Sequence, residues 1–472
     1  MNISIKKRFN SIKLPARASL FYIGAGAVGK LTGVLFTPLF TRILSGEEYG
    51  EYARYLSIVG VASVIGSSLT SSSAIYKGLE EKTTQSKDYL KSVLVINLAF
   101  SLVFCLLLFT FNRFLGVKLS FLIPISLQIF ADGITAVYLT GAKFKYKYLP
   151  VTAILLIGSL IPPILSAFII SRVGKGFIVR TYCLLTVSII TASFSLIKIW
   201  CDGKVSLSLV KNAFRSTMPL IPHGLSNAVS SQADKLILAS VMGAKSLAKY
   251  SIVFSLGMAL QFTVTALSSA LSPWIIRRLK AAEQEKISSL TFPILISYLS
   301  LSICLVALAP EAMNILAPPD YLDALPALVP IALSVPLSFA SGVLTVILVY
   351  FGKGGYTALV SSIGSAICII LNYTLISYFG YLGAGLSLLI CQAFVAFSEV
   401  YAIKKIGFKD ALPFNKILLC CLIGFLGCVG VYMLRERFIL RLFFLIIPAF
   451  VLLLCLVRIK DLVFEKRGKN PS

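Results

Sequence analysis

Runs of about 20 apolar residues recur from one end of this 472-residue chain to the other. A stretch of that length, coiled as an α-helix, crosses the roughly 30 Å hydrocarbon core of a membrane. About 14 such runs can be placed between residues 19 and 457. Because hydrocarbon cannot hydrogen-bond to exposed backbone, each run is predicted to be helical. We therefore expect an all-α polytopic membrane protein with about 14 transmembrane helices.

Composition and loop length exclude a large soluble domain. The chain is 57% hydrophobic and 13% charged, whereas soluble proteins have about 25% charged residues. The longest polar connections between runs are 78–91, 200–216 and 277–288. They leave no room for a catalytic or nucleotide-binding domain outside the membrane. The ten cysteines and the single histidine show no spacing typical of a metal site, so no metal, cofactor or catalytic residue is predicted.

The formal net charge is +25, and the basic residues are distributed unevenly. When the N-terminus and every second loop are assigned to one side, that side holds most of the 44 lysine and arginine residues. By the positive-inside rule this side is cytoplasmic, and both termini are expected there. The basic excess is then explained by topology and by contact with anionic lipid, so nucleic acid is not an expected partner.

Lys30 lies near the middle of the first apolar run, 18–44. A lysine at the centre of a span costs roughly 2.5–3.5 kcal/mol on insertion scales, and it is tolerated where it faces protein, water or an anion. Helical periodicity places small or polar residues on the same face: Gly26, Gly33, Thr37 and Thr41. The lysine is therefore predicted to face a cavity.

The segment 24–30 fits G-x-G-x-x-G and most of a P-loop. Leu31 stands where a P-loop needs Ser or Thr, and both motifs require the strand–turn–helix unit of a soluble domain. A nucleotide site is therefore not expected. Gly29 and Gly33 are interpreted as a small-xxx-small pair that allows close helix packing.

Further polar residues lie within or beside other runs. Asp132 is near the middle of the fourth run, and polar residues follow one side of the seventh run: His223, Asn227, Ser230 and Asp234. Lys235 comes next in the chain. Three arginines lie toward the outer side: Arg42, Arg54 and Arg180.

Two interpretations of these residues stay open. Each cation can pair with a carboxylate for structure alone, arginines near an interface can anchor a helix, and a histidine at a helix end need not relay protons. Alternatively, the cations bind an anionic headgroup such as phosphate or pyrophosphate: Lys30, Arg42, Arg54, Arg180 and Lys235. The other polar residues would then line the cavity or couple transport to a proton or sodium gradient: Asp132, Asp234, Asn227 and His223.

The sequence repeats weakly at about 200 residues. Segments 44–52 and 242–250 follow the first and seventh runs, and both are short turns that end in tyrosine. Six runs per unit return the chain to its starting side, so the units are parallel repeats with a site expected at their interface. The predicted division is a cytoplasmic N-terminus (1–17), an N-lobe (18–200), a cytoplasmic linker (201–217), a C-lobe (218–404), two further helices (405–457) and a cytoplasmic tail (458–472).

Two segments resemble the O-antigen and polysaccharide flippases. Pro38–Ser45 running into Tyr49–Tyr52 resembles the first hairpin of that family. Pro219–Gly224, followed by Asp234–Leu238 and Tyr250, resembles its counterpart in the second half. The family shares a superfamily with multidrug and toxic-compound extruders and with lipid II flippases. Lys30 is the only cation deep in the first run, where the lipid II branch typically has arginines, and this disfavours that branch.

The resemblance implies two six-helix lobes in a V-shape, two C-terminal helices and alternating access in a bacterial inner membrane. The implied cargo is an undecaprenyl-pyrophosphate-linked oligosaccharide, an O-antigen or similar repeat unit of lipopolysaccharide or another surface polysaccharide. It would move from the cytoplasmic to the periplasmic leaflet. Implied partners are this polyprenyl-pyrophosphate-linked glycan, the lipid bilayer, and the polymerase and chain-length proteins of the same pathway.

Two other functions stay open. A small-molecule or drug antiporter of the same architecture would favour carboxylates over cations in its cavity. A membrane-embedded polysaccharide polymerase would be an enzyme with a large outer loop, but the longest outer connection, 310–325, is short and contains no lysine or arginine. We therefore expect a transporter and not an enzyme.

Overall fold

A computed structural model describes residues 14–70, 73–81, 85–110, 119–173, 176–201, 204–218, 221–281, 283–407 and 414–464. All regular secondary structure in these ranges is helical, which confirms the all-α prediction. The chain divides into two compact units, Met1–Ala248 and Lys249–Ser472.

The first unit contains α2 (Leu14–Ile43), α3 (Gly46–Thr70), α4 (Ser73–Glu81), α5 (Ser86–Thr110), α7 (Leu119–Phe144), α8 (Tyr148–Val173), α9 (Gly176–Trp200), α10 (Leu207–Thr217) and α11 (Ile221–Met242). Helix α12 (Ala244–Lys280) begins at the boundary. The second unit continues with α13 (Gln284–Leu316), the 3₁₀ segment η3 (Pro319–Ala327), α14 (Leu328–Tyr350), α15 (Gly354–Phe379), α16 (Tyr381–Lys405), α17 (Phe414–Met433) and α18 (Phe438–Phe464).

Over the described residues, each predicted apolar run falls on helix, and the second run is divided between α3 and α4. Ten of these helices are long and apolar enough to cross a membrane: α5, α7, α8, α9, α12, α13, α14 together with η3, α15, α16 and α18. The apolar part of α17 that is described, Ile417–Met433, is shorter. The exact count of 14 spans stays a prediction.

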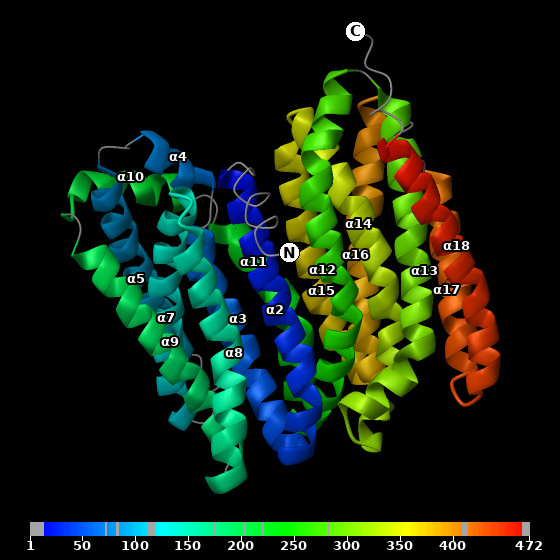
Figure 1. Cartoon of the computed structure of the whole chain (residues 1–472), viewed down its shortest axis with the longest axis horizontal. Helices are drawn as coiled ribbons and strands as arrows, with labels where there is room; N and C mark the ends of the chain where they lie inside the picture. The colour runs from blue at the N-terminus through cyan, green and yellow to red at the C-terminus, as the bar shows by residue number, and fades with distance from the viewer. Residues whose placement is uncertain are drawn as a thin grey trace, which may run out of the picture. The chain divides into compact units, whose positions relative to one another are not determined.

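In the first unit, α2 packs along α8, α3 packs on α7 and α11, and α7 packs on α5 and α9. Figure 1 shows these helices running roughly parallel or antiparallel to one another. Buried apolar side chains from α3, α5 and α7 form one core: Tyr55, Ile58, Val59, Ala62, Cys105, Leu108, Ile125 and Ile129. The turn between α2 and α3 is fixed by a capping box, because the Glu48 N–H donates to Ser45 Oγ (3.2 Å) and the Ser45 N–H donates to Glu48 Oε2 (3.0 Å).

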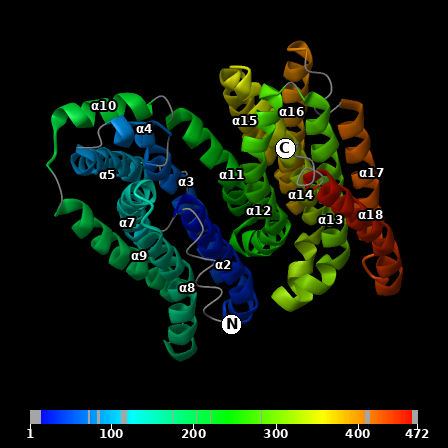
Figure 2. The same ribbon diagram turned by 45° about the horizontal axis from the view of Figure 1, so that its top comes forward.

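Two short surface helices were not predicted. The second predicted run, between the turn 44–52 and the connection 78–91, is divided in two, because α3 ends at Thr70 and α4 begins at Ser73. Much of the expected polar connection 200–216 is α10. Figure 2 shows α4 and α10 beside each other across the end of α5. Both bury apolar residues in a shared core with α5: Ile75, Leu79, Tyr89, Val93, Leu209 and Ala213. With 9 and 11 residues they are too short to stand out as spans.

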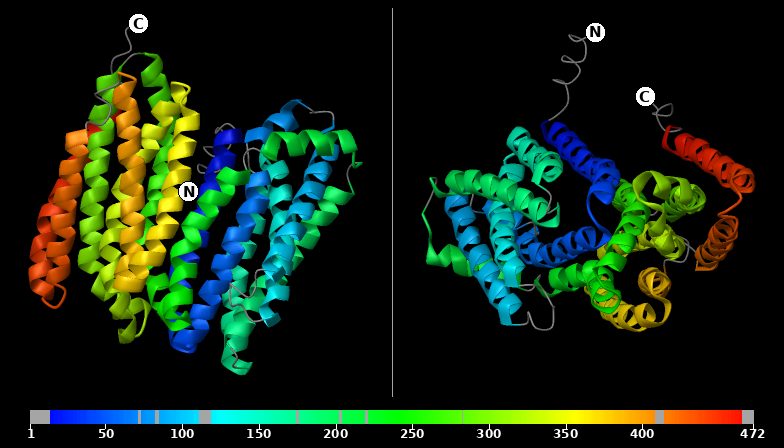
Figure 3. Two further views of the ribbon diagram at one scale, coloured as in Figure 1. Left: turned by 180° about the vertical axis from the view of Figure 1, so that it is seen from behind. Right: turned by 90° about the horizontal axis from the view of Figure 1, so that it is seen from below.

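In the second unit, α13 packs on α14, and α14 and α15 both pack on α16. Figure 3 shows α17 and α18 at the edge of this unit, where both contact α13. The expected outer connection 310–325 is mostly ordered as helix, because α13 continues to Leu316 and η3 follows. The contacts of α11 are with α3, so α11 groups with the first unit, whereas the sequence division at residue 218 assigns it to the C-lobe.

Candidate functional site

Helix α2 is open around Lys30, on the face that the lysine shares with Gly26 and Gly33, whereas Thr41 further along this face is buried. Gly29, on a neighbouring face, packs on α8, since a Cβ added there would lie 3.4 Å from Ser159 Cβ. A Cβ added at Gly26 or Gly33 would have no described neighbour within 4 Å, and Lys30 is exposed. Gly29 therefore allows close helix packing as predicted, but Gly33 does not, and Lys30 points away from the core.

Helix α11 places a second lysine near the first. Lys235 is half-buried, and its Nζ donates to Gln232 Oε1 at 3.4 Å. Lys30 on α2 and Asp234 both lie within electrostatic range of Lys235. Asp234 is buried, and its Oδ1 accepts the backbone N–H of Lys235 at 2.8 Å. The structure thus brings three of the predicted residues together: Lys30, Asp234 and Lys235.

Close contact between α3 and α11 fixes this arrangement. Gln232 lies against Gly60 of α3, where an added Cβ would be 3.4 Å from the Gln232 side-chain carbon Cδ. The start of α3 also meets the chain after α11, because a Cβ on Gly50 would lie 1.7 Å from the Ala244 carbonyl oxygen. Only glycine permits the approach at Gly50, whereas a Cβ at Gly60 would make an ordinary contact with Gln232.

Asp132 belongs to a separate polar group inside the first unit. Gln128, one turn before it on α7, donates from Nε2 to Asp132 Oδ1 at 2.8 Å and lies 2.7 Å from Ser188 Oγ on α9. The charge of Asp132 also acts on the buried hydroxyl of Tyr55. No ion pair to Asp132 occurs among the described residues. Asp132 is thus held by neutral hydrogen-bonding groups and is not paired with Lys30.

Arg180 is enclosed by aromatic rings. Its guanidinium carbon lies 3.8 Å from the ring centre of Phe40 on α2 and 4.0 Å from that of Tyr52 on α3, with Tyr49 at 5.4 Å. Stacking of this kind stabilises a cation whose charge is partly removed from water. In this conformation Arg180 joins α2, α3 and α9.

The remaining predicted residues lie toward helix ends, or their side chains lie outside the described part of the chain. Arg54 is 4.0 Å from Glu51 and is partly buried. Arg42 is exposed in the last turn of α2. His223 and Asn227 lie on α11, in a stretch whose side chains are outside the described part of the chain.

The sequence analysis missed one buried carboxylate. Glu399 on α16 is 1% exposed, and its two oxygens accept hydrogen bonds from hydroxyls on α14, Ser341 at 2.7 Å and Thr345 at 2.6 Å. The signal was present, because Glu399 is the only acidic residue in the apolar run 382–403. It lies in the second unit, whereas the other candidate residues lie in the first.

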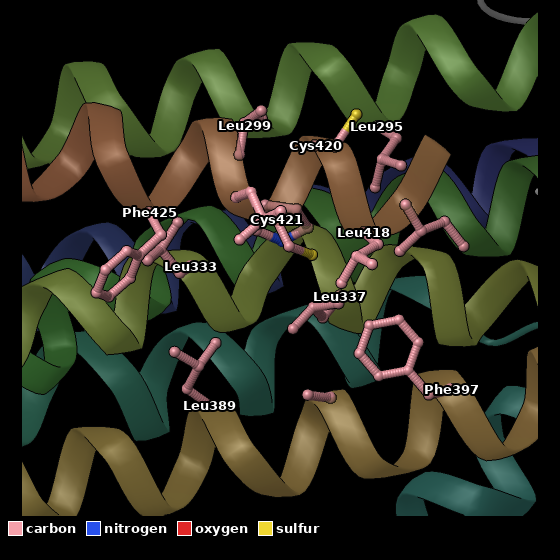
Figure 4. Close-up of a pocket in the computed structure, with 14 residues that line it drawn as sticks. Leu295, Leu299, Leu333, Leu337, Leu389, Phe397, Leu418, Cys420, Cys421 and Phe425 are labelled. Atoms are coloured by element: carbon pink, nitrogen blue, oxygen red, sulfur yellow. The ribbon is translucent and has the colours of Figure 1, made fainter. Parts of the chain in front are cut away.

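The second unit also contains an apolar pocket of about 240 Å³ between α13, α14, α16 and α17. Figure 4 shows leucine and phenylalanine side chains converging on it, together with Cys420 and Cys421. No charged residue lines this pocket. It suits a hydrocarbon chain and cannot hold a charged headgroup.

Sequence comparison gives one family. A profile described as polysaccharide biosynthesis protein matches residues 16–278. The matched region includes α2, α3, α9 and α11, which carry all of the predicted cationic residues. No curated protein sequence matches the chain significantly.

Solved structures of transporters share the fold. The lipid II flippase MurJ in an inward closed conformation has a TM-score of 0.68 and 16% identity, and the match covers 95% of this chain and 100% of that chain. An inward-facing multidrug resistance MATE family transporter of the MOP superfamily has a TM-score of 0.59 and 13% identity, with coverage of 87% and 96%. A MOP superfamily transporter from Pyrococcus furiosus, described as having a binding pocket of reverse polarity, has a TM-score of 0.53 and 12% identity, with coverage of 90% and 97%. Identities this low establish the fold alone.

Proposed function

The chain belongs to the polysaccharide biosynthesis protein family, and on that premise we propose that it is a flippase for a lipid-linked oligosaccharide. The cargo is an undecaprenyl-pyrophosphate-linked repeat unit of O-antigen or a similar surface polysaccharide. It moves from the cytoplasmic to the periplasmic leaflet of a bacterial inner membrane by alternating access, with both termini of the protein in the cytoplasm.

One observation carries the proposal: Lys30 lies in the first apolar helix on a face that is open at Gly26 and Gly33, where an added Cβ would have no described neighbour within 4 Å. A lysine inside a membrane span is costly unless it faces protein, water or an anion. A pyrophosphate beside Lys30 would accept charge-assisted hydrogen bonds from its ammonium group. Lys235 on α11, half-buried next to Asp234, is the second proposed ligand of the headgroup.

The polyprenyl chain and the sugars of the cargo need an apolar and a polar environment, respectively. The polyprenyl chain stays in the lipid, where the apolar pocket between α13, α14, α16 and α17 offers further contact. The sugars need a polar path, and Gly26 and Gly33 leave the Lys30 face of α2 open within the first unit. Arg54 and Arg42, near the outer end of the first hairpin, would receive the headgroup after the change of access. Polymerase and chain-length proteins are proposed as later partners.

The test is complementation of a strain that lacks this gene, with protein level and surface polysaccharide both measured. Lys30→Ala and Lys235→Ala at normal protein level should each reduce surface polysaccharide strongly, and the double variant should abolish it. Lys30→Arg keeps the positive charge but changes the geometry of the hydrogen-bond donors, because a guanidinium binds phosphate differently from an ammonium. It therefore tests whether a positive charge at this position is sufficient. Lys245→Ala, an exposed lysine at the start of α12 in the same unit, is the matched control and should restore polysaccharide fully.

Full restoration by Lys30→Ala would show that this lysine does not bind the headgroup. A deletion strain that keeps its surface glycan but becomes sensitive to cationic dyes would instead indicate a drug antiporter. Incorporation of sugar by the purified protein would indicate an enzyme.

A further inference from the structure

A pocket lined by four lysines lies at the end of the first unit where α5 begins and α9 ends. Its volume is about 230 Å³. Lys87 comes from the first turn of α5, Lys145 and Lys147 from the turn between α7 and α8, and Lys198 from the last turn of α9. The floor is uncharged: Leu90, Tyr138, Gly141, Ala142 and Ile199. None of the lining residues in the described part of the chain is acidic.

The turn that carries two of these lysines has a fixed geometry. The Lys147 N–H donates to the Ala142 carbonyl at 2.9 Å, and the Tyr146 N–H donates to the Lys143 carbonyl at 3.0 Å. This is the pattern of a Schellman motif, and Tyr146 has the required left-handed conformation with a φ of 52°. Lys145 and Lys147 therefore stand on a defined backbone and not on a variable loop.

Close packing beneath the lysines forms the floor of the pocket. A Cβ added at Gly141 of α7 would lie 2.5 Å from a methyl carbon of Leu90 on α5, so a larger residue there requires the Leu90 side chain to move. Helix α5, which carries Lys87, and helix α7, which leads into the α7–α8 turn, are thus packed closely at the floor of the pocket.

Neighbouring charged residues are engaged elsewhere. Lys91, one turn after Lys87, is buried, donates to the Trp200 carbonyl at 3.2 Å and lies 4.4 Å from the Trp200 ring centre. Asp88 accepts the Lys204 backbone N–H at 2.6 Å. Lys87, Lys145, Lys147 and Lys198 are all exposed to solvent, and the Lys198 Nζ also lies 5.7 Å from the Phe194 ring centre.

We infer that this pocket binds the headgroup phosphate of an anionic membrane lipid. Lysine is a common phosphate ligand, and basic pockets between transmembrane helices on the cytoplasmic side bind such headgroups. The positive-inside rule, the basis for the proposed orientation of the chain, places these four lysines on that side. The position is distinct from the group formed by Lys30 and Lys235.

Exposed apolar side chains beside the pocket favour a lipid over a soluble phosphate. Phe194 and Ile197, within the turn before Lys198, are 43% and 60% exposed, and Leu149, just after Lys147, is 63% exposed. Acyl chains attached to a headgroup in the pocket can lie along these side chains. A free diphosphate has no apolar group that could contact these side chains.

Lipid binding to the purified full-length protein in detergent tests the inference. Native mass spectrometry and thermal unfolding are measured with cardiolipin, which has two phosphates, with phosphatidylcholine, and with inorganic diphosphate. The variant is the triple substitution Lys145→Gln, Lys147→Gln and Lys198→Gln. Its control is Lys404→Gln with Lys405→Gln, which removes two lysines from the end of α16. The melting temperature without added lipid reports whether each variant is folded.

Cardiolipin should remain bound to the wild type and to the control, and should raise their melting temperatures more than phosphatidylcholine does. The triple variant should bind cardiolipin roughly 100-fold more weakly, at about fivefold for each lysine near an anionic surface. Inorganic diphosphate should displace cardiolipin from the wild type.

Equal cardiolipin binding by the triple variant and the wild type would overturn the inference, as would equal binding of phosphatidylcholine. Binding of diphosphate without any retained lipid would overturn the assignment to a membrane lipid. No cargo is present in these measurements, so their outcome is independent of the complementation test of the proposed function.

Discussion

Arg441 of α18 donates from both terminal guanidinium nitrogens to the two carboxylate oxygens of Glu311 on α13, with the Nη1 to Oε2 distance at 2.9 Å. Nη1 also donates to the Ala307 carbonyl at 2.6 Å. The arginine side chain is 5% exposed and the glutamate 38%. This paired contact holds the peripheral C-terminal helix against the second unit, where apolar packing alone would allow it to rotate or slide.

Removing one member of this pair should destabilise the protein more than removing both. Glu311→Gln leaves a buried guanidinium without its carboxylate and should cost about 2 kcal/mol, less than the 3–5 kcal/mol of a fully buried pair because the glutamate is partly exposed. The double variant Glu311→Gln with Arg441→Met should recover part of that loss. Thermal unfolding of the purified variants measures both effects, and additive losses would show that the two side chains do not act as a pair.

The buried carboxylate of Glu399 should be a stabilising element of the second unit. Glu399→Ala leaves the Ser341 and Thr345 hydroxyls without their acceptor and creates a cavity, which together should cost about 2–4 kcal/mol. Glu399→Gln fills the same space and keeps hydrogen-bonding capacity, so its cost should be smaller. The melting temperatures of the two variants and the wild type, measured in detergent, test this order of stability. An alanine variant as stable as the wild type would refute the prediction.

Replacing a glycine should have opposite effects at two positions of the first unit. Gly50→Ala directs a methyl group to within 1.7 Å of the Ala244 carbonyl oxygen, so the backbone must shift, at a cost of about 1–3 kcal/mol. Gly24→Ala on α2 meets no described atom within 4 Å and should be neutral or stabilising by up to about 1 kcal/mol. Unfolding temperatures of the two variants, measured side by side, should therefore change in opposite directions or differ clearly. Equal effects would contradict the close approach at Gly50.

The aromatic enclosure of Arg180 should require the planar guanidinium. Arg180→Lys keeps the charge but loses stacking on Phe40 and Tyr52, and it should cost about 1–2 kcal/mol. Phe40→Leu should weaken the same contact. A double-mutant cycle of these two substitutions, followed by thermal unfolding, should give a coupling of about 0.5 kcal/mol or more. Independent, additive effects would place Arg180 outside this enclosure.

The sequence analysis predicted the long helices well because each is specified locally, by the length of an apolar run. It did not predict α4 and α10, since 9 and 11 residues are too few to span a membrane and their apolar faces are buried only by contact with α5. It grouped Lys30, Asp234 and Lys235 in one expected site between the two repeats. It did not give the helix contacts, such as those of α11 with α3, that determine where these side chains lie.

Residue type and spacing by themselves determined that the chain is helical, that it is a membrane protein and that charged residues within its spans are exceptional, because the bilayer imposes these constraints on each segment separately. Only tertiary packing decided which groups each charged side chain contacts. Arg180 is stacked between aromatic rings, Asp132 accepts a hydrogen bond from a neutral amide, Glu399 accepts hydrogen bonds from two hydroxyls, and Lys30 lies within electrostatic range of Lys235. Those outcomes depend on which helix faces come into contact, and contact between distant segments is not encoded in the composition of either one.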